Sequence, residues 1–434
     1  MKALTALSCV AVANAFILPD PKIFEQSAVK NDDRHAASWW DRVPSKDSIL
    51  NTVEDGVDSL SAHIEGALHS LEDAAEDKFE NLFEEQLLAD EPHHGPPKKT
   101  IYELISESKY TTEFAKLVSE YDDIVEVLKS TDANHTLFVP TNRAFEHIPK
   151  HKKPSKEVVE AILKYHVGIG EYDAKRVLRT HTLPTLLDES FLGGKPQRLR
   201  TSVGLGGVRV NFYAKVVAVN IRATNGIIHG VNSLIIPPPM VGRELTLLPS
   251  RFSTLLLAYE KTDFVKYIHG VKSTGTTVFA PSNAAFARLG FKANAFLFNT
   301  ECGLKYLKAL LKYQIVANAT LYSDAFYRPD HKDASVTGHY HIDLPTLLDG
   351  KNIAVDVATW GGWTKVKLNG YIPIVVGDAI AKNGVIHVPG RVPIPPHKHK
   401  ADVDGEISVE DLKERLSDFV DEKEKEGSWL EEEL

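Results

Sequence analysis

The sequence FVPTNRAF at residues 138–145 returns, slightly altered, as FAPSNAAF at residues 279–286. Three further segments recur in the same order between the two halves of the chain. They are KYHV at 164–167 and KYQI at 312–315, LPTLLD at 183–188 and 344–349, and NGIIH at 225–229 and NGVIH at 383–387. A repeat of about 150 residues is the size of a whole domain rather than of a solenoid unit. The sequence therefore predicts a tandem duplication of one module.

The N-terminus has the pattern of a secretory signal peptide. Lys2 precedes a short apolar stretch, and residues 13–15 read ANA, which places small residues at −3 and −1 of a cleavage site. After residue 15 no apolar run is long enough to cross a bilayer, so we expect no transmembrane span. The formal net charge of −9 argues against a nucleic-acid partner, which needs a concentrated basic face.

The expected compartment permits disulfides and N-glycans. Removal of the signal peptide leaves Cys302 as the single cysteine, which excludes an intramolecular disulfide in the mature chain. Cys302 lies in an apolar stretch with helical pattern, and we expect it to be buried. Asn134 and Asn318 stand in Asn-X-Thr acceptor sequences, so we expect a glycoprotein.

Changes in composition divide the chain. We expect a signal peptide at 1–15, a polar, amphipathic helical region with a linker at 16–99, the two modules at 100–239 and 241–396, and an acidic helical tail at 397–434. Within the N-terminal region, the apolar residues between 45 and 90 follow a helical spacing opposite an acidic face. This stripe favours packing or self-association, with peripheral membrane contact as the alternative.

The tail and the modules carry local signals of their own. Ser408 and Asp411 predict the start of a helix whose apolar face, Leu412, Leu416 and Phe419, needs a partner. Each module starts with helical patterns and ends in alternating, strand-like ones. Hairpins are expected at 198–211 and 353–368, and the Asn-Gly pairs at 225 and 383 predict type I′ turns.

With these motifs, both modules resemble the fasciclin (FAS1) domain family, as two tandem FAS1 domains in a fungal-like secretory protein. The family pattern T-x-F-x-P-[ST]-N-x-A-F fits residues 136–145 and 277–286, and the resemblance covers about two thirds of the chain. It implies an α+β fold with a helical layer on a two-sheet β wedge in each module, flanked here by amphipathic helical segments.

The motif residues have a physical interpretation as determinants of the fold. We expect the prolines to end strands, the asparagines to cap the following helix or bond a turn, and the phenylalanines to enter the core. His166 is expected to be half buried and hydrogen-bonded, and Gln314 replaces it in module 2. The family-motif residues are Pro140, Asn142, Phe145, Tyr165, His166, His229, Pro281, Asn283, Phe286, Tyr313 and His387.

No pattern in the sequence indicates catalysis or a cofactor. His339 and His341 have the spacing of two ligands on one face of a strand, but no third ligand is defined, so we expect no metal. Trp360 and Trp363 flank a Gly-Gly turn, where they could stack on sugar or lipid or pair across a hairpin. There is no nucleophile elbow, phosphate loop or cysteine nucleophile, and we expect no enzyme.

The resemblance implies a non-enzymatic secretory-pathway protein that mediates cell-surface adhesion or binds a protein or a cell-wall or matrix partner. We expect it to be secreted or at the cell surface. The alternative is a lumenal protein of a vacuole-like organelle, held near membranes or partners by its flanking amphipathic helices. A third hypothesis, a hydrolase or ligand-binding protein, requires a cleft in one module.

Overall fold

The computed structural model describes residues 97–146, 154–204, 207–329, 334–335, 338–360, 363–396 and 407–420. The expected signal peptide at 1–15 and the amphipathic stretch at 45–90 lie outside the described residues. Within the described ranges, no helix has both the length and the apolar composition that a membrane crossing requires.

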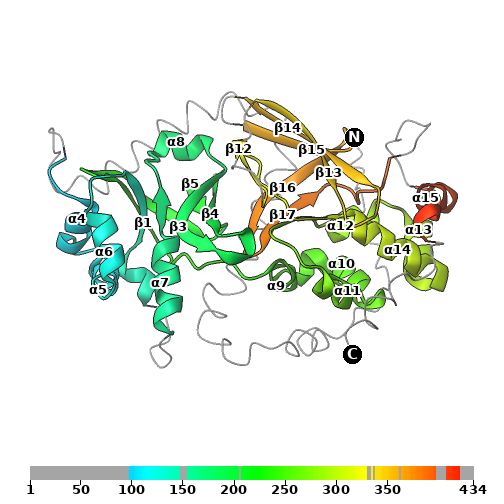
Figure 1. The fold of residues 1–434 in the computed structure, drawn as a ribbon, viewed down its shortest axis with the longest axis horizontal. Coiled ribbons are helices and arrows are strands. Elements are labelled where there is room, and N and C mark those ends of the chain that lie inside the picture. Colours follow the sequence, from blue (N-terminus) through cyan, green and yellow to red (C-terminus); the bar gives the residue numbers. More distant parts are fainter. Residues whose placement is uncertain are drawn as a thin grey trace, which may run out of the picture. The chain divides into compact units, whose positions relative to one another are not determined.

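Module 1 places helices first and strands later, as the sequence predicts (Figure 1). Its helices are α4 (Ile101–Glu107), α5 (Thr112–Val118), α6 (Asp122–Lys129), α7 (Lys156–Tyr165) and α8 (Ala174–Arg179), with 3-10 turns η2 (Asn142–Phe145) and η3 (Ser190–Leu192). Its strands are β1 (His135–Pro140), β2 (Val167–Ile169), β3 (Thr182–Glu189), β4 (Lys195–Gly204), β5 (Gly207–Val210), β6 (Ala214–Ala223) and β7 (Gly226–Val231). The seven strands close into a barrel in chain order, with β7 parallel to β1.

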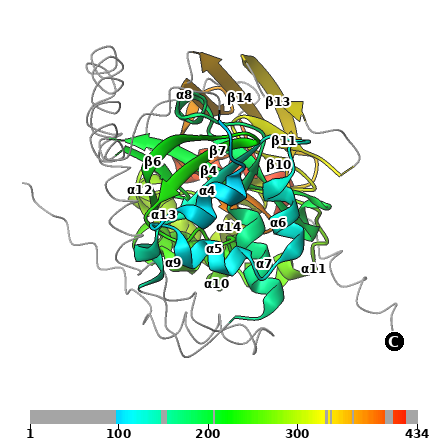
Figure 2. The same cartoon turned by 90° about the vertical axis from the view of Figure 1, so that its left-hand side faces the viewer.

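The helices of module 1 form by ordinary capping and by burial of one apolar face. Thr100 and Glu103 make a capping box at the start of α4. Apolar side chains of α4, α5 and α6, among them Ile105, Phe114 and Leu128, pack on Leu137 of β1 in one core cluster. Figure 2 faces this side of module 1, where α4, α5 and α6 lie together in front of the strands. The α+β class predicted from the sequence is confirmed.

Module 2 repeats this order with more helix and one long sheet. Its helices are α9 (Val241–Leu247), α10 (Pro249–Lys261), α11 (Phe264–Gly270), α12 (Asn283–Ala287), α13 (Phe291–Asn299) and α14 (Glu301–Tyr313). Its strands are β8 (Thr276–Phe279), β9 (Ile315–Ala317), β10 (Thr320–Leu321), β11 (Ala325–Tyr327), β12 (Ala334–Ser335), β13 (His339–Pro345), β14 (Asn352–Trp360), β15 (Trp363–Leu368), β16 (Ile372–Ala381) and β17 (Gly384–Pro389). Seven of them form the sheet β13-β14-β15-β16-β17-β8-β9, and β10, β11 and β12 form a small separate sheet.

The Asn-Gly motifs do not form type I′ turns. The hairpins exist, but Ala223 pairs with Gly226 and Ala381 with Gly384, so the two-residue turns are 224–225 and 382–383. No residue of these turns has the positive φ that type I′ requires. Instead, the asparagine of each motif forms a long-range hydrogen bond, and the glycine permits a close approach of two strands.

The asparagine of each motif anchors the first helix of its own module. The Oδ1 atom of Asn225 accepts from the backbone N–H of Ile101 at 2.9 Å, and its Nδ2 donates to the carbonyls of Leu128 and Ser130. In module 2, Asn383 accepts from the N–H of Val241 at 2.9 Å. Each hairpin turn therefore supplies a hydrogen-bond acceptor to a helix N-terminus that would otherwise lack one.

The glycine of each motif permits a close backbone approach. Gly226 has φ of +147°, and a Cβ built on it would lie 1.9 Å from the carbonyl oxygen of His135. Gly384 has φ of +156°, and its Cβ would lie 1.9 Å from the carbonyl oxygen of Thr276. A side chain is therefore excluded where the last strand of each module meets the first.

Of two other sequence predictions, the one for Cys302 is wrong in part and the one for the long hairpins is confirmed. Cys302 is helical, as expected, but exposed rather than buried. It lies in the first turn of α14, whose buried face is formed by residues such as Tyr306, Leu307 and Leu310. The two long hairpins are confirmed, and the register of the second pairs Trp360 with Trp363 across β14 and β15.

The C-terminal helix finds its partner within module 2. The helix α15 (Val409–Leu416) starts at Ser408, whose Oγ accepts from the N–H of Asp411, and it continues into the 3-10 turn η4 (Ser417–Phe419). Leu412 and Leu416 are fully buried, and α15 packs on α13 and α14. The predicted apolar face is therefore covered by the chain itself.

We expect Gly226→Ala to lower the free energy of unfolding by at least about 2 kcal/mol, because the added methyl group overlaps the backbone of β1. Gly242→Ala in α9 is the matched control, since a Cβ there meets nothing within 4 Å and alanine favours a helix. Urea denaturation of both variants measures the difference. Equal stability of the two variants would contradict the close-approach account.

Candidate functional site

The repeated motif residues lie inside the modules. Tyr165 and Tyr313 are fully buried, and each hydroxyl bonds an asparagine at the start of the turn after β5 or β15, Asn211 at 2.8 Å and Asn369 at 3.1 Å. Pro140 ends β1 and Pro281 follows β8, and both are buried. Phe286 is buried, whereas Phe145 is partly buried against two core clusters. None of these groups is presented to a ligand.

The motif asparagines tie each strand to an earlier helix. Asn142 accepts from the N–H of Glu113 at 3.1 Å and donates to the carbonyl of Lys109 at 2.9 Å. Asn283 accepts from the N–H of Thr254 at 2.9 Å in the same way. The sequence predicted a cap on the following helix or a bond to a turn, but the amide group reaches back across about 30 residues, because the strand end lies beside α5 or α10.

The histidines of the last strands bridge backbone groups in both modules. His229 Nε2 lies 2.7 Å from the carbonyl of Tyr172, and its Nδ1 faces the N–H of Asn220. His387 repeats this arrangement with the carbonyl of Leu321 at 2.7 Å and the N–H of Asp378. Burial lowers the pKa of His229. Each imidazole therefore bridges two backbone groups, one at each ring nitrogen.

His166 is fully buried, not half buried as the sequence suggested. Its Nε2 accepts from the N–H of Ile235 at 3.0 Å, so its Nδ1 donates to the carbonyl of Ile162 at 2.7 Å. Burial lowers its pKa to about 4, although the bond to Ile162 opposes that shift. Its counterpart Gln314 is also buried, and its Nε2 has no hydrogen-bond partner. The His-to-Gln difference therefore changes the core, not an exposed recognition surface.

The two acceptor asparagines are exposed, but their threonines are not. Asn134 directly precedes β1, and Asn318 lies between β9 and β10. The Oγ1 of Thr136 donates to the carbonyl of Gly170 at 2.7 Å, and Thr320 is fully buried. The use of these acceptor sequences stays a prediction.

The two histidines with ligand-like spacing, His339 and His341, lie on β13. His341 lies 2.6 Å from Asp356 through Nδ1 and 3.8 Å from Asp343 through Nε2, all on an exposed face. The hydrogen bond to Asp356 raises the pKa of His341. Among the described residues, no group of three or more histidine, cysteine or acidic side chains is arranged to hold a metal ion.

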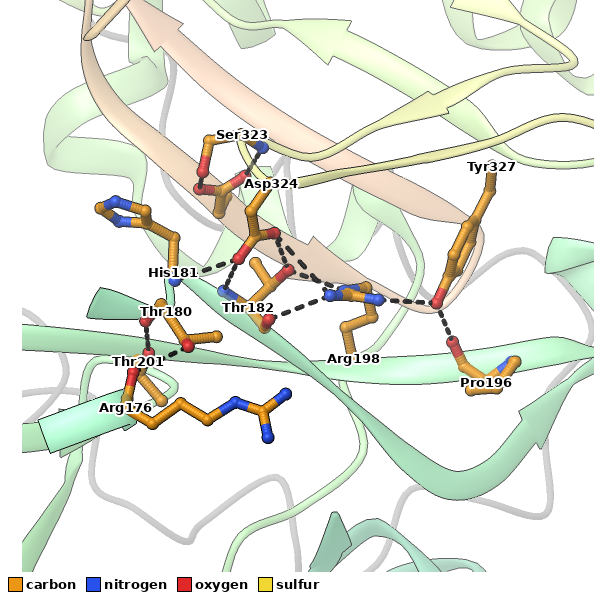
Figure 3. Close-up of polar contacts among 11 residues, drawn as sticks. Arg176, Thr180, His181, Thr182, Pro196, Arg198, Thr201, Ser323, Asp324 and Tyr327 are labelled. Carbon is orange, nitrogen blue, oxygen red and sulfur yellow. Dashed lines mark hydrogen bonds and ion pairs between the residues drawn. The ribbon is translucent and has the colours of Figure 1, made fainter. Parts of the chain in front are cut away.

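A polar cluster lies at the seam, the surface on which β3 and β4 of module 1 meet β11, β16 and the turn before β11 of module 2 (Figure 3). Asp324 extends from module 2 and accepts from the N–H groups of His181 at 3.1 Å and Thr182 at 2.8 Å. The hydroxyl of Thr182 also donates to this carboxylate. One acidic side chain thus satisfies the backbone at the start of β3.

Arg198 completes this cluster from β4. Its Nε donates to the Thr182 hydroxyl at 2.7 Å and its Nη1 to the Tyr327 hydroxyl at 3.0 Å. Its Nη2 donates to the Thr182 carbonyl and lies 3.8 Å from Asp324. The carbonyl of Arg198 accepts from the buried Tyr165 hydroxyl at 2.8 Å, which links the seam to the core of module 1.

Further contacts extend the seam on both sides. Gln197 donates to the carbonyl of Ala381 at 3.1 Å, and Arg200 donates to that of Gly377 at 3.0 Å. Leu192 of module 1 joins an apolar cluster whose other members come from module 2: Tyr322, Ala325, Tyr327, Ile380 and Val385. The seam therefore combines a desolvated polar centre with apolar packing, as stable interfaces do.

Burial shapes the electrostatics of the seam. Desolvation raises the pKa of Asp324, against the opposing attraction of Arg198. Desolvation also lowers the pKa of Arg200 to about 10, with Asp378 acting in the opposite direction. Since Arg198 and Arg200 belong to module 1 and Asp324 and Asp378 to module 2, cations of one module face anions of the other.

The described residues offer little room for a small ligand. A hollow of about 190 Å³, part of which is open solvent, is lined largely by apolar side chains of module 2, with Tyr322, Ser323 and His387. Ligand pockets in proteins usually enclose about 300 to 1,000 Å³. Ser323 and His387 are already hydrogen-bonded within the module. The hydroxyl of Tyr322 is buried without a partner.

The chain belongs to the Fasciclin domain family, whose model matches residues 109–237 and 250–395. The family resemblance seen in the sequence is thereby confirmed.

Individual relatives extend this finding. Aurofusarin biosynthesis cluster protein S of Gibberella zeae is 28% identical over 368 residues, which are 76% of this chain and 89% of that protein. Fasciclin-1 of Schistocerca americana is 25% identical over 272 residues, 58% of this chain and 38% of that protein. A solved FAS1 domain pair from the insect cell adhesion molecule fasciclin I aligns with 64% of this chain and 95% of its own, at 16% identity and a TM-score of 0.30.

Sequence reasoning missed the seam. Tyr327, which contacts module 1, belongs to none of the repeated motifs. A usable signal was present. When the LPTLLD segments are aligned, Arg198 and Arg200 of module 1 occupy the positions that Asn352 and Ala354 occupy in module 2. Unequal charge at matched positions of a repeat indicates unequal surroundings.

Asp324→Ala should lower the stability of the full chain by about 2 to 4 kcal/mol, because it leaves two backbone N–H groups and the Thr182 hydroxyl without their acceptor and Arg198 without its counter-ion. Glu107→Ala is the control, since it breaks the exposed Lys99–Glu107 ion pair and should cost less than about 1 kcal/mol. Guanidinium denaturation measures both. Equal small losses would show that the seam carries no stability.

His166 makes stability depend on pH in a defined direction. Its pKa is about 4 in the folded chain and about 6.5 when unfolded, so the unfolded chain binds the extra proton between these values. Its contribution is complete above pH 6.5 and falls by roughly 3 kcal/mol as the pH drops to 4. Urea denaturation between pH 7 and 4 should show a shallower pH dependence for His166→Gln. An unchanged slope would contradict this assignment.

Proposed function

We propose that this protein acts through its surfaces as a non-enzymatic adhesion or matrix-binding protein of the secretory pathway. The family assignment supports this, and so does the relationship to fasciclin-1, because fasciclin I is described as an insect cell adhesion molecule. The buried, internally bonded motif residues and the small hollow of module 2 favour surface recognition over chemistry in a cleft.

The observation that carries the proposal is one strongly exposed aromatic side chain in each module. Tyr110, between α4 and α5, is 63% exposed, and Phe291, at the start of α13, is 75% exposed. Lys109 lies 5.1 Å from the Tyr110 ring, which places a cation beside this aromatic surface. Aromatic residues dominate the binding energy of protein interfaces. Two such positions on one chain allow two contacts to act together.

The contrast between the two modules supports a role for Tyr110 outside the core. The segment SKYTT at 108–112 matches SRFST at 250–254. The counterpart of Tyr110 is therefore Phe252, which is 3% exposed. The same position is therefore apolar core in module 2 and an exposed phenol in module 1. A residue needed only for packing would be buried in both.

We expect Tyr110→Ser and Phe291→Ser each to weaken binding of the full chain to cell-wall or matrix material by about tenfold or more, with the fold intact. Val265→Ser removes an exposed aliphatic side chain from α11 and is the matched control. Sedimentation of the chain with the material, followed by circular dichroism of each variant, measures both properties. Unchanged binding in both aromatic variants would contradict the proposed surface.

A second candidate function is a non-catalytic accessory role in a biosynthetic route. It is favoured by aurofusarin biosynthesis cluster protein S, which matches across both modules and 89% of its own length. The same variants separate the two candidates. Loss of co-purification with secreted enzymes, while binding to wall material persists, would favour the accessory role.

A further inference from the structure

The seam joins two different faces of a repeated module. Module 1 contributes its β3–β4 face, defined by Thr182, Arg198 and Arg200. Module 2 contributes its β11–β16 face, defined by Asp324 and Gly377. Because the modules are repeats, each face has a counterpart that the seam leaves unused. These are a β13–β14 face on module 2 and an α8–β6 face on module 1.

Hydrogen bonds fix the residues of the β13–β14 face. In module 1, Asn211 and Arg200 exchange bonds, and Arg200 pairs with Thr182 across β3 and β4. In module 2, Asn369 and Ala354 exchange the same bonds, and Ala354 pairs with Asp343 across β13 and β14. Asp343 therefore occupies in module 2 the position that Thr182 occupies at the seam.

Hydrogen bonds also fix the residues of the α8–β6 face. The N–H of Ser323 donates to Asp378 at 2.8 Å, and the N–H of Ala174 donates to Asn220 at 2.7 Å. The residue after Ser323 is the seam carboxylate Asp324. The residue after Ala174 is Lys175, which therefore occupies in module 1 the position of Asp324.

At the position of the seam carboxylate Asp324 the α8–β6 face carries the cation Lys175, and at the position of Thr182 the β13–β14 face carries Asp343. The β13–β14 face carries Asp343, with 59% of its side chain exposed, and Asp356, with 43%. His341 contacts both carboxylates, and Lys367 of β15 pairs with Asp356 across the strands, so both residues offset part of the negative charge. The α8–β6 face carries the exposed cations Lys175 and Arg176.

The neighbours of these cations leave the charge on the surface. Arg176 stacks on the Tyr172 ring at 3.9 Å and donates to the backbone carbonyl of Glu171. These contacts hold the guanidinium at the surface, and the carbonyl does not neutralise its charge. Asp173 caps the backbone of α8. At the seam, Thr182 contacts Asp324. If the unused faces of two copies met in the same way, Asp343 would contact Lys175.

We propose that the chain associates head to tail with a second copy of itself, the β13–β14 face of one copy against the α8–β6 face of the next. A symmetric pairing through either face alone would not bring Asp343 to Lys175, so it lacks this contact between opposite charges. When two copies pair through two different faces, the pair still has one free face of each kind. Further copies can then add, and the assembly grows into an open chain or closes into a ring. Because the paired charges are exposed, added salt weakens the association.

The test uses the full mature chain and two charge reversals, Lys175→Glu and Asp343→Lys. Sedimentation velocity of the wild type over a range of concentrations should show association that diminishes with salt. Each variant alone places like charges together and should stay monomeric. An equal mixture of the two variants should associate again, because both contacts in the mixture, Asp343 with Lys175 and their reversed pair, join opposite charges.

Lys116→Glu on α5 and Glu260→Lys on α10 are exposed control reversals with the same change of net charge, and they should leave the association unchanged. A wild type that is monomeric at every concentration would overturn the proposal. So would variants that associate alone, or a mixture of the two variants that stays monomeric. Binding to wall or matrix material is measured separately, so this proposal can fail while the proposed function stands.

Discussion

The Asp324 carboxylate is the contact on which the arrangement of the two modules depends. It belongs to module 2, but its hydrogen bonds satisfy backbone and hydroxyl groups at the start of β3 in module 1. Arg198 lies beside it and is itself bonded to Thr182 and Tyr327, so the two charged side chains of this cluster are hydrogen-bonded. A buried charge is unfavourable unless it is paired in this way. If the two modules shifted at the seam, Asp324 and Arg198 would lose their partners and the chain would be destabilised.

Each module is held by repeated internal contacts that leave little polar chemistry at the surface. The Asn225 and Asn383 side chains anchor the first helix of their modules, and Gly226 and Gly384 let the last strand approach the first. His229 and His387 bridge two backbone groups each. The motifs that identify the family are therefore fold determinants. Function is left to exposed positions, where the two modules differ.

The sequence predicted much of the fold, because a domain-length repeat with helical and strand-like patterns constrains topology strongly. The order of elements, the two long hairpins and the C-terminal helix follow from local periodicity and capping residues such as Ser408. The type I′ turns and the buried Cys302 were wrong. In both cases the outcome depends on long-range packing: Gly226 faces β1, and Cys302 lies on the outer side of α14.

The seam could not be predicted in the same way. Thr182 and Asp324 are 142 residues apart, and neither belongs to a motif with characteristic spacing. Only a comparison of the two modules, position by position, separates residues that hold a module together from residues that differ because their surroundings differ. Arg198 and Lys175 are of the second kind.

The central claim is that the two modules form one body through the Asp324–Arg198 cluster. Differential scanning calorimetry of the full chain tests it most directly. The account predicts one cooperative transition in which the calorimetric and van't Hoff enthalpies agree for the whole two-module unit. Two separate transitions, each unaffected by Asp324→Ala, would contradict it.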